Sequence, residues 1–131
     1  MKVGFIGLGN VGGKLARSLL RNNFDLTVRD LDKNLTQTFK DLGANIANSA
    51  KEIAEQVDLI ITCLPSPKIC AEVMEAKDGV ISGLSENKIW LEMSTTDEAE
   101  IKRISKKIIA KQAVPLAVSY THLTLPTICS V

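Results

Sequence analysis

The chain of 131 residues carries 16 Lys and Arg against 15 Asp and Glu, which gives a formal net charge of +1. This length suits one domain and is too short for two, and a hydrophobic fraction of 45% is too high for a disordered chain. The balanced charge gives no general attraction to nucleic acid or to an anionic membrane, and the longest apolar run, Leu59-Ile60-Ile61, is far too short to span a bilayer.

Short strand-like and helix-like patterns alternate along the chain. The predicted strands are Lys2–Ile6 and residues 26–28, 46–47, 58–63 and 88–93, with a further strand near Val114. Apolar residues at helical spacing lie between them, beginning with Val11, Leu15 and Leu19 and ending with Ile101, Ile104 and Ile108. The alternation predicts an α/β fold, a doubly wound parallel sheet with helices on both faces.

Residues that cap helices stand at the predicted helix boundaries. Gly43 fits the position just past the end of the second helix, and Pro67 follows Ser66 at the start of another. The predicted N-caps are Asp32, Ser66, Ser49 in a capping box with Glu52, and Thr95 in a capping box with Glu98.

The cysteine and histidine content gives no sign of a metal site or a disulfide framework. Cys63, Cys70 and Cys129 are widely spaced, and the single histidine, His122, has no ligand partner nearby. The N-terminus opens directly into a strand pattern and lacks the apolar core of a signal peptide. We expect a cytoplasmic protein with reduced thiols, in which Cys63 and Cys70 are packing residues.

The segment Gly7-Leu8-Gly9-Asn10-Val11-Gly12 matches G-x-G-x-x-G, the pattern of a dinucleotide-binding loop, and is called the glycine loop below. It follows a predicted strand and opens a predicted helix, as a Rossmann-type fold requires. Gly7 permits the tight turn, Gly9 lets the backbone approach a pyrophosphate, and Gly12 lets the helix pack closely on the strand. The helix N-terminus would offer its unpaired N–H groups to the phosphates. A glycine-rich turn without a ligand is the alternative.

Asp30 closes the next strand, 18 residues after Gly12, close to the spacing expected for an acid that binds the adenosine ribose. The alternative is a solvated carboxylate at a strand end. Arg29 would suit the 2′-phosphate of NADP, but neighbouring residues of a strand point to opposite sides. The sequence therefore favours NAD and leaves NADP possible.

Three segments together resemble the β-hydroxyacid dehydrogenases, a family that includes 3-hydroxyisobutyrate dehydrogenase and tartronate semialdehyde reductase. They are residues 3–12, which contain the glycine loop, residues 58–65, which end in Leu-Pro, and residues 90–96, similar to the family's Asp-x-Ser-(Ser/Thr) strand end. Glu92 stands where the family usually has Asp, and Val11 replaces a common methionine.

The resemblance implies a set of cofactor contacts. The backbone of the glycine loop would hold the pyrophosphate, Asp30 would meet the adenosine ribose, Leu64 and Pro65 would line the cleft, and Thr95 would lie near the nicotinamide. Ser94 and Thr95 have a second interpretation, as residues that end a strand and cap a helix.

The resemblance also implies an oxidoreductase that exchanges a hydride between the nicotinamide and a small 3-hydroxy acid. In the family an all-helical second domain follows. It supplies the catalytic lysine, which acts as general acid, and it forms the dimer. Residues 1–116 are expected to be the dinucleotide-binding domain, and no catalytic residue is assigned in them. Alternatives are a fragment similar to 6-phosphogluconate dehydrogenase or to an imine reductase, or a non-catalytic NAD-binding module.

Residues 117–131 depart from the family pattern. Residues 118–127 are the translation of GTC TCT TAT ACA CAT CTG ACG CTG CCG ACG, which resembles the adapter of transposase-based sequencing libraries. We expect this tail to be foreign to the domain, so that His122 has no catalytic role. A genuine, unusual C-terminus is the alternative. Without the second domain, we expect the isolated chain to be inactive and poorly soluble.

Overall fold

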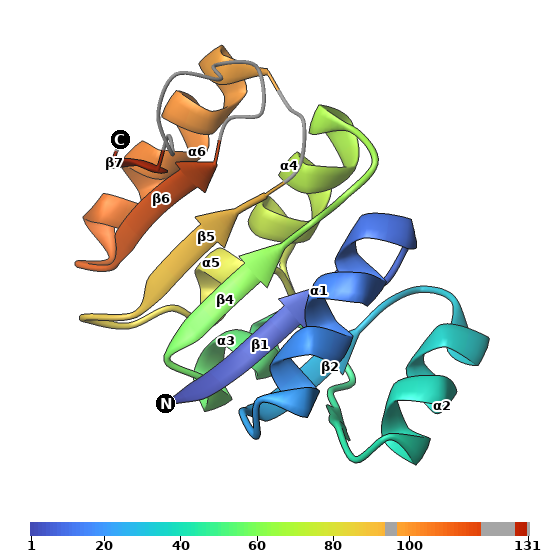
Figure 1. Ribbon diagram of the computed structural model, residues 1–131. Coiled ribbons are helices and arrows are strands. Elements are labelled where there is room, and N and C mark those ends of the chain that lie inside the picture. Colours follow the sequence, from blue (N-terminus) through green and yellow to red (C-terminus); the bar gives the residue numbers. More distant parts are fainter. Residues whose placement is uncertain (94–96, 119–127, 131) are drawn as a thin grey trace.

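The sheet of this protein has the strand order β3-β2-β1-β4-β5-β6-β7 in a computed structural model that describes residues 1–93, 97–118 and 128–130 (Figure 1). The strands are β1 (Lys2–Ile6), β2 (Asp25–Arg29), β3 (Asn45–Ile46), β4 (Leu59–Thr62), β5 (Ile89–Glu92), β6 (Val114–Val118) and β7 (Ile128–Ser130). The first six are parallel, and β7 pairs antiparallel with β6. The predicted doubly wound parallel sheet is confirmed.

Helices cover both faces of the sheet, each through its own apolar core. On one face, α1 (Asn10–Arg21) and α2 (Lys33–Asp41) pack with Phe5, Leu26 and Val28. On the other, Ile60 and Trp90 pack against the remaining helices, which are α3 (Ala50–Gln56), α4 (Pro67–Glu75), α5 (Val80–Gly83) and α6 (Glu98–Ala110). Burial on both faces explains why the central strands are almost continuously apolar.

The register of the sheet aligns the residues that follow four strands. Ile6 is paired with Arg29 and with Thr62, and Thr62 is paired with Glu92. The next residue of each strand, namely Gly7, Asp30, Cys63 and Met93, therefore lies at one common edge. This edge, at the carboxyl ends of the strands, is where open α/β sheets bind ligands.

Most of the predicted helix boundaries are confirmed, because the caps act locally. The side chain of Asp32 accepts a hydrogen bond from the N–H of Asn34, and that of Ser49 accepts one from Glu52. Ser66 accepts from the N–H of Ile69, with Pro67 at the first helical position. Gly43 has a φ of 106°, a conformation that L residues with a Cβ rarely adopt.

The predicted cap of the last helix is wrong. Asp97 caps α6, since its carboxylate accepts from the N–H groups of Ala99, at 2.8 Å, and of Glu100. An ionised carboxylate is a stronger acceptor for these N–H groups than a hydroxyl. Thr95, predicted as the cap, lies outside the described residues, as does Ser94.

The predicted buried face of α1 is also corrected at its first turn. Val11 is 57% exposed, whereas Gly12, Gly13 and Ala16 are buried, and Leu15 and Leu19 are partly buried against the core. The start of α1 approaches the sheet so closely that only residues with little or no side chain fit there. Helical spacing alone cannot distinguish such a close approach from an ordinary apolar face.

The predicted junction after residue 116 falls inside a strand. β6 continues to Val118, with Ala117 paired to Glu92 of β5, and β7 then pairs with β6 through Ile128, Cys129 and Ser130. The division into a domain at 1–116 and a foreign tail at 117–131 stays a prediction. His122 lies outside the described residues.

Candidate functional site

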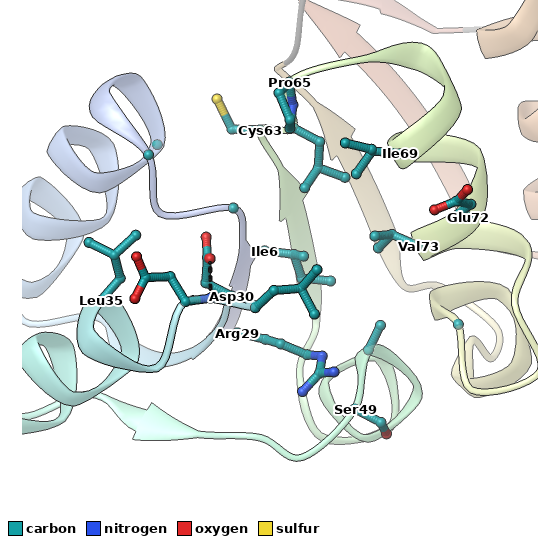
Figure 2. A pocket seen from close by; sticks show the side chains of 18 of the residues that line it. Ile6, Arg29, Asp30, Leu35, Ser49, Cys63, Pro65, Ile69, Glu72 and Val73 are labelled. Carbon is teal, nitrogen blue, oxygen red and sulfur yellow. Dashed lines mark hydrogen bonds between the residues drawn. The ribbon is translucent and has the colours of Figure 1, made fainter.

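A cleft of about 1190 Å³ opens at the carboxyl ends of β1, β2 and β4. It lies at the point where the chain changes direction in the sheet, since β2 and β3 extend from one side of β1 and β4 from the other. Figure 2 shows Asp30 and Leu35 on one side of the cleft and Ile69, Glu72 and Val73, which belong to α4, on the opposite side. The topology alone makes this the expected ligand site of an open α/β sheet.

The glycine loop forms one wall of the cleft; Gly7 and Gly12 are required by close backbone contacts, and Gly9 leaves the backbone open. Gly7 has a φ of 101°, and a Cβ there would lie 2.2 Å from the carbonyl oxygen of Cys63. A Cβ on Gly12 would lie 2.0 Å from the carbonyl oxygen of Gly7. Around Gly9 no atom lies within 4 Å of the position that a Cβ would take, so the backbone there is open to a ligand.

The N-terminus of α1 points into the same region. Gly9 is its N-cap and provides no side-chain hydrogen bond, and the first turn contains no acidic residue. The first N–H groups of a helix have no partner within the helix, and their dipoles favour an anion. The end of α1 thus presents a positive partial charge beside the open backbone of Gly9, which is the arrangement that a pyrophosphate requires.

Asp30 joins the end of β2 to this loop. One carboxylate oxygen, Oδ2, accepts a hydrogen bond of 2.7 Å from the backbone N–H of Leu8, and Oδ1 accepts one of 2.8 Å from the N–H of Asp32. Each carboxylate oxygen has a second lone pair, so the group retains acceptor capacity for hydroxyl groups of a ligand. The alternative of a merely solvated carboxylate does not agree with these two contacts.

The side chain of Arg29 points away from Asp30, as expected, and still borders the cleft. Its guanidinium is directed toward the start of α3, where Nη1 donates a hydrogen bond of 2.7 Å to the carbonyl oxygen of Asn48 (Figure 2). It does lie on the opposite side from the Asp30 carboxylate, as strand alternation predicts. Nevertheless Arg29 lines the cleft, because the strand ends there and the cleft extends over both sides of the sheet edge.

The other predicted site residues divide into three groups. Asn10, Val11, Leu64 and Pro65 line the cleft together with the glycines and Asp30. Leu8 does not line it, because its side chain is only 2% exposed and packs in the core beside α1 and α2, while its N–H is bonded to Asp30. Thr95 lies outside the described residues.

Several cleft residues were not predicted from the sequence. The most regular group lies on α4 and its end, where Ile69, Glu72, Val73 and Ala76 face the cleft. Their spacing of three, four and seven residues is a helix face, but the mixture of apolar and charged side chains concealed it. Leu31, Asn48 and Met93 also line the cleft, and they follow or precede regular elements without a motif of their own.

The side of the cleft that Ile69, Glu72, Val73 and Ala76 form is called the α4 wall below. Behind it lies a buried chain of hydrogen bonds. The indole Nε1–H of Trp90 donates to Thr62 Oγ1 at 2.9 Å, and the hydroxyl of Thr62 donates to Glu92 Oε2 at 2.8 Å. The thiol of Cys70 donates to the same Glu92 oxygen at 2.9 Å. All four side chains are at most 1% exposed. This confirms Cys70 as a buried residue on α4.

Neither of the two cysteines whose side chains are described is an activated nucleophile. Burial raises the pKa of the Cys70 thiol strongly, and the nearby carboxylate of Glu92 raises it further. Burial also raises the pKa of Cys63, which lines the cleft and is half-buried. Both are free thiols. They are therefore protonated at neutral pH, and protonated thiols are poor nucleophiles and poor metal ligands. Within the described residues, no group of three His, Cys, Asp or Glu side chains is placed to hold a metal ion.

The parallel sheet, the glycine loop and the cleft at its edge define a dinucleotide-binding α/β domain. The sequence profile of the NAD-binding domain of 6-phosphogluconate dehydrogenase matches residues 2–119, and the chain belongs to this family. The match extends beyond residue 116, to which the predicted domain was limited.

Curated relatives include 3-hydroxyisobutyrate dehydrogenases. The mitochondrial enzyme of Mus musculus is 34% identical over 112 residues, which are 86% of this chain and 33% of the relative. A probable 3-hydroxyisobutyrate dehydrogenase of Dictyostelium discoideum is 38% identical over 108 residues, which are 80% of this chain and 34% of the relative. The chain thus spans about a third of the length of these relatives. The predicted resemblance to the β-hydroxyacid dehydrogenases is confirmed.

Solved structures agree with this assignment. The 3-hydroxyisobutyrate dehydrogenase of Salmonella typhimurium superimposes with a TM-score of 0.81 at 27% identity, over 91% of this chain and 42% of that one. An imine reductase from Pseudomonas sp. gives a TM-score of 0.76 at 26% identity, over 88% of this chain and 40% of that one. Across the described residues, no helix combines the length and apolarity needed to cross a membrane.

Proposed function

We propose that the cleft binds NAD, with the pyrophosphate on the glycine loop and the adenosine ribose at Asp30. The observation that carries this proposal is the open backbone at Gly9 beside the uncapped N-terminus of α1. Two phosphates placed there would accept hydrogen bonds from the first N–H groups of the helix. Leu64 and Pro65 would form the wall beyond β4, and Thr95 would lie toward the nicotinamide.

The residues of the cleft fit the cofactor in shape and in charge. Gly9 leaves space where any other residue would place a Cβ, and the carboxylate of Asp30 is held at the mouth of the loop by the N–H of Leu8. When bound, NAD supplies a carbon that accepts or donates a hydride. The chain's own residues bind and orient the cofactor, and none of the described residues is assigned a role in proton transfer.

Asp30 favours NAD over NADP. A 2′-phosphate on the ribose would lie beside the Asp30 carboxylate, and two negative groups at that distance repel each other. Arg29 borders the cleft, but its guanidinium is directed toward the carbonyl of Asn48, on the other side of the strand end. NADP remains the second candidate because this cation is still within the cleft.

For the intact protein, we infer an oxidoreductase that exchanges a hydride between NAD and a small 3-hydroxy acid, such as 3-hydroxyisobutyrate or the product of tartronate semialdehyde reduction. The supporting observation is that this chain is 34% and 38% identical to two proteins named as 3-hydroxyisobutyrate dehydrogenases. A second domain would supply the catalytic lysine and the dimer contacts, so the isolated chain would bind cofactor without turnover. Binding of nucleic acid is not part of this proposal.

Specific observations also support two other functions for the intact protein. The imine reductase of Pseudomonas sp. is nearly as similar in structure as the dehydrogenase, and the family profile comes from 6-phosphogluconate dehydrogenase. An NAD-binding module without catalysis is a third possibility for the chain alone. A cytoplasmic location is also proposed. The free thiols of both cysteines with described side chains fit a reducing compartment of any kind, and the relatives of Mus musculus and Dictyostelium discoideum are named as mitochondrial.

The test is a titration of the purified chain with NADH, observed through its single tryptophan. Trp90 is fully buried on β5, next to the strand whose end lines the cleft, so bound NADH should quench its emission by energy transfer. We expect saturable quenching with NADH and weaker binding of NADPH. Absence of saturable binding of either nucleotide at millimolar concentration would show that the cleft is not a nicotinamide cofactor site.

A further inference from the structure

The buried chain of hydrogen bonds from Trp90 to Cys70 connects three segments that each border the cleft. Thr62 is the last residue of β4 and is followed by Cys63, which lines the cleft. Glu92 is the last residue of β5 and is followed by Met93, which also lines it. Cys70 belongs to α4. The shared acceptor, Glu92 Oε2, therefore lies where the carboxyl ends of β4 and β5 meet α4.

Cys70 and the cleft lie on different sides of α4. Ile69 and Val73 face the cleft, whereas Cys70 and Met74 are buried against the sheet. A hydrogen bond that holds Cys70 therefore also sets the rotation of α4 and the depth of its cleft-facing side chains. The helix has only nine residues, so one such contact near its start influences most of its length.

A contact to Glu92 is costly to leave unmade because the carboxylate is 1% exposed. A buried acceptor that loses its donor keeps its desolvation cost without the hydrogen bond that offset it. The folded state is therefore more stable when Cys70, and with it α4, lies at hydrogen-bonding distance from β5.

We propose that Glu92 is a positioning residue for the cofactor cleft, acting through Cys70 to hold the α4 wall against the bound nucleotide. This inference rests on the proposed binding of NAD. The length of Glu92 is part of the arrangement. An aspartate, which is the usual residue of the resembling family at this position, has a side chain that is one methylene shorter.

Two substitutions at Cys70 test the hydrogen bond. Cys70→Ala removes the donor, and Cys70→Ser restores a donor on a side chain of similar reach. Alanine has the higher helix propensity of the two, so propensity alone favours the Ala variant. Helix propensity therefore cannot explain a better result for Ser than for Ala, which is the result that the contact with Glu92 predicts.

The first readout needs no cofactor. Hydrogen exchange of the α4 amides is measured in the free chain, with α6 as an internal reference. We expect α4 to exchange about tenfold faster in Cys70→Ala than in the wild type, because the loss of one buried hydrogen bond is worth that order. Cys70→Ser should be close to the wild type. Equal exchange of α4 in the Ala and Ser variants would overturn the proposal.

The second readout is the Kd for NADH, from the quenching of Trp90. Cys70→Ala should raise the Kd by about threefold to tenfold, while Cys70→Ser should remain near the wild-type value. Ile108→Val is the matched control, since it loosens the same core from α6 and leaves every residue of α4 unchanged. A control that weakens NADH binding as much as Cys70→Ala does would reduce the effect to general stability and overturn the proposal.

The two readouts also separate this inference from the proposed function. If the wild type does not bind NADH, the proposed function fails, whereas the α4 exchange still decides whether Glu92 holds the helix. If α4 loosens in Cys70→Ala and the Kd does not change, Glu92 holds the helix but does not position the cleft, and the inference is wrong although the chain binds NAD.

Discussion

The carboxylate of Asp30 and the backbone N–H of Leu8 are joined by a hydrogen bond of 2.7 Å, although 22 residues separate them. The same side chain that is predicted to bind the ribose therefore also holds the glycine loop in place. Preorganisation of this kind lowers the ordering cost that a ligand would otherwise meet on binding. It also means that a change at Asp30 acts on two parts of the cleft at once.

Replacement of Asp30 by alanine should weaken NADH binding by about tenfold to a hundredfold, because hydrogen bonds to a carboxylate contribute about 1.5–3 kcal/mol. The affinity for NADPH should fall by less, because removal of the carboxylate also removes its repulsion of the 2′-phosphate. The measurement is the ratio of the two Kd values. Asp41→Ala, at an exposed carboxylate at the end of α2, is the control and should leave the ratio unchanged. An unchanged ratio in Asp30→Ala would remove Asp30 from the ribose site.

An added methyl group should lower the stability of the domain at Gly12 and should weaken cofactor binding at Gly9. Gly12→Ala places a Cβ 2.0 Å from the carbonyl oxygen of Gly7, so we expect a stability loss of about 1–3 kcal/mol or more. Gly9→Ala meets no protein atom within 4 Å and has an ordinary φ of −67°, so its unfolding temperature should stay near the wild type. Its methyl group would nevertheless occupy the place of the pyrophosphate. NADH binding as strong as in the wild type would show that nothing approaches Gly9.

The pH dependence of stability should contain a contribution from Glu75 on α4. Hydrogen bonds from Arg103 and Lys107 of α6 lower the pKa of Glu75 to about 2 from its ordinary value of 4.5. Since the folded state binds this proton less readily than the unfolded state, the stabilisation is fully present above pH 4.5. It is lost as the pH falls from 4.5 toward 2.

The measurement for Glu75 is the difference in unfolding midpoint between the wild type and Glu75→Gln, from pH 7 down to pH 2.5. The wild type should be the more stable protein at neutral pH, and the difference should shrink below pH 4.5, because a protonated Glu resembles Gln. High salt at neutral pH should also reduce the difference, since the side chains of Arg103 and Lys107 are 43% and 52% exposed. A constant difference across this range would contradict the assignment.

Removal of residues 119–131 should leave the domain intact if the tail is foreign to it. Six parallel strands remain, and among the described strand pairs those lost are the three between β6 and β7. We expect the unfolding temperature to change by less than about 5 °C, which for a domain of this size corresponds to roughly 1 kcal/mol. The Kd for NADH should stay within about twofold. Failure of the shortened chain to fold would show that the tail belongs to the domain.

Sequence reasoning was most accurate where several local signals coincide. The unit from Lys2 to Arg21 contains a strand, a glycine loop and a helix in direct succession, and each follows from residues only a few positions apart. The same holds for the caps at Asp32, Ser49 and Ser66. It failed at the start of α6, where Thr95 and Asp97 are both good cap residues and a pattern cannot choose between neighbours.

It also failed where one pattern serves two purposes. Val11 has the spacing of a core residue on α1, but it lies at the cleft, because the glycines beside it make the closest approach to the sheet. Arg29 follows strand alternation, yet it borders the cleft because the strand ends there. Periodicity reports which residues share a face, and it does not report what covers that face.

The sequence by itself determined the class of this protein, since the glycine loop, Asp30 and the alternation of strands and helices are local patterns with a direct physical meaning. Only the tertiary structure decided which side chains meet around the cleft. The bond from Cys70 to Glu92 and the cleft-facing side of α4 join segments about 20 residues apart or more. Such contacts depend on the register of the sheet and on how each helix is rotated against it, and no pattern within a single segment encodes either.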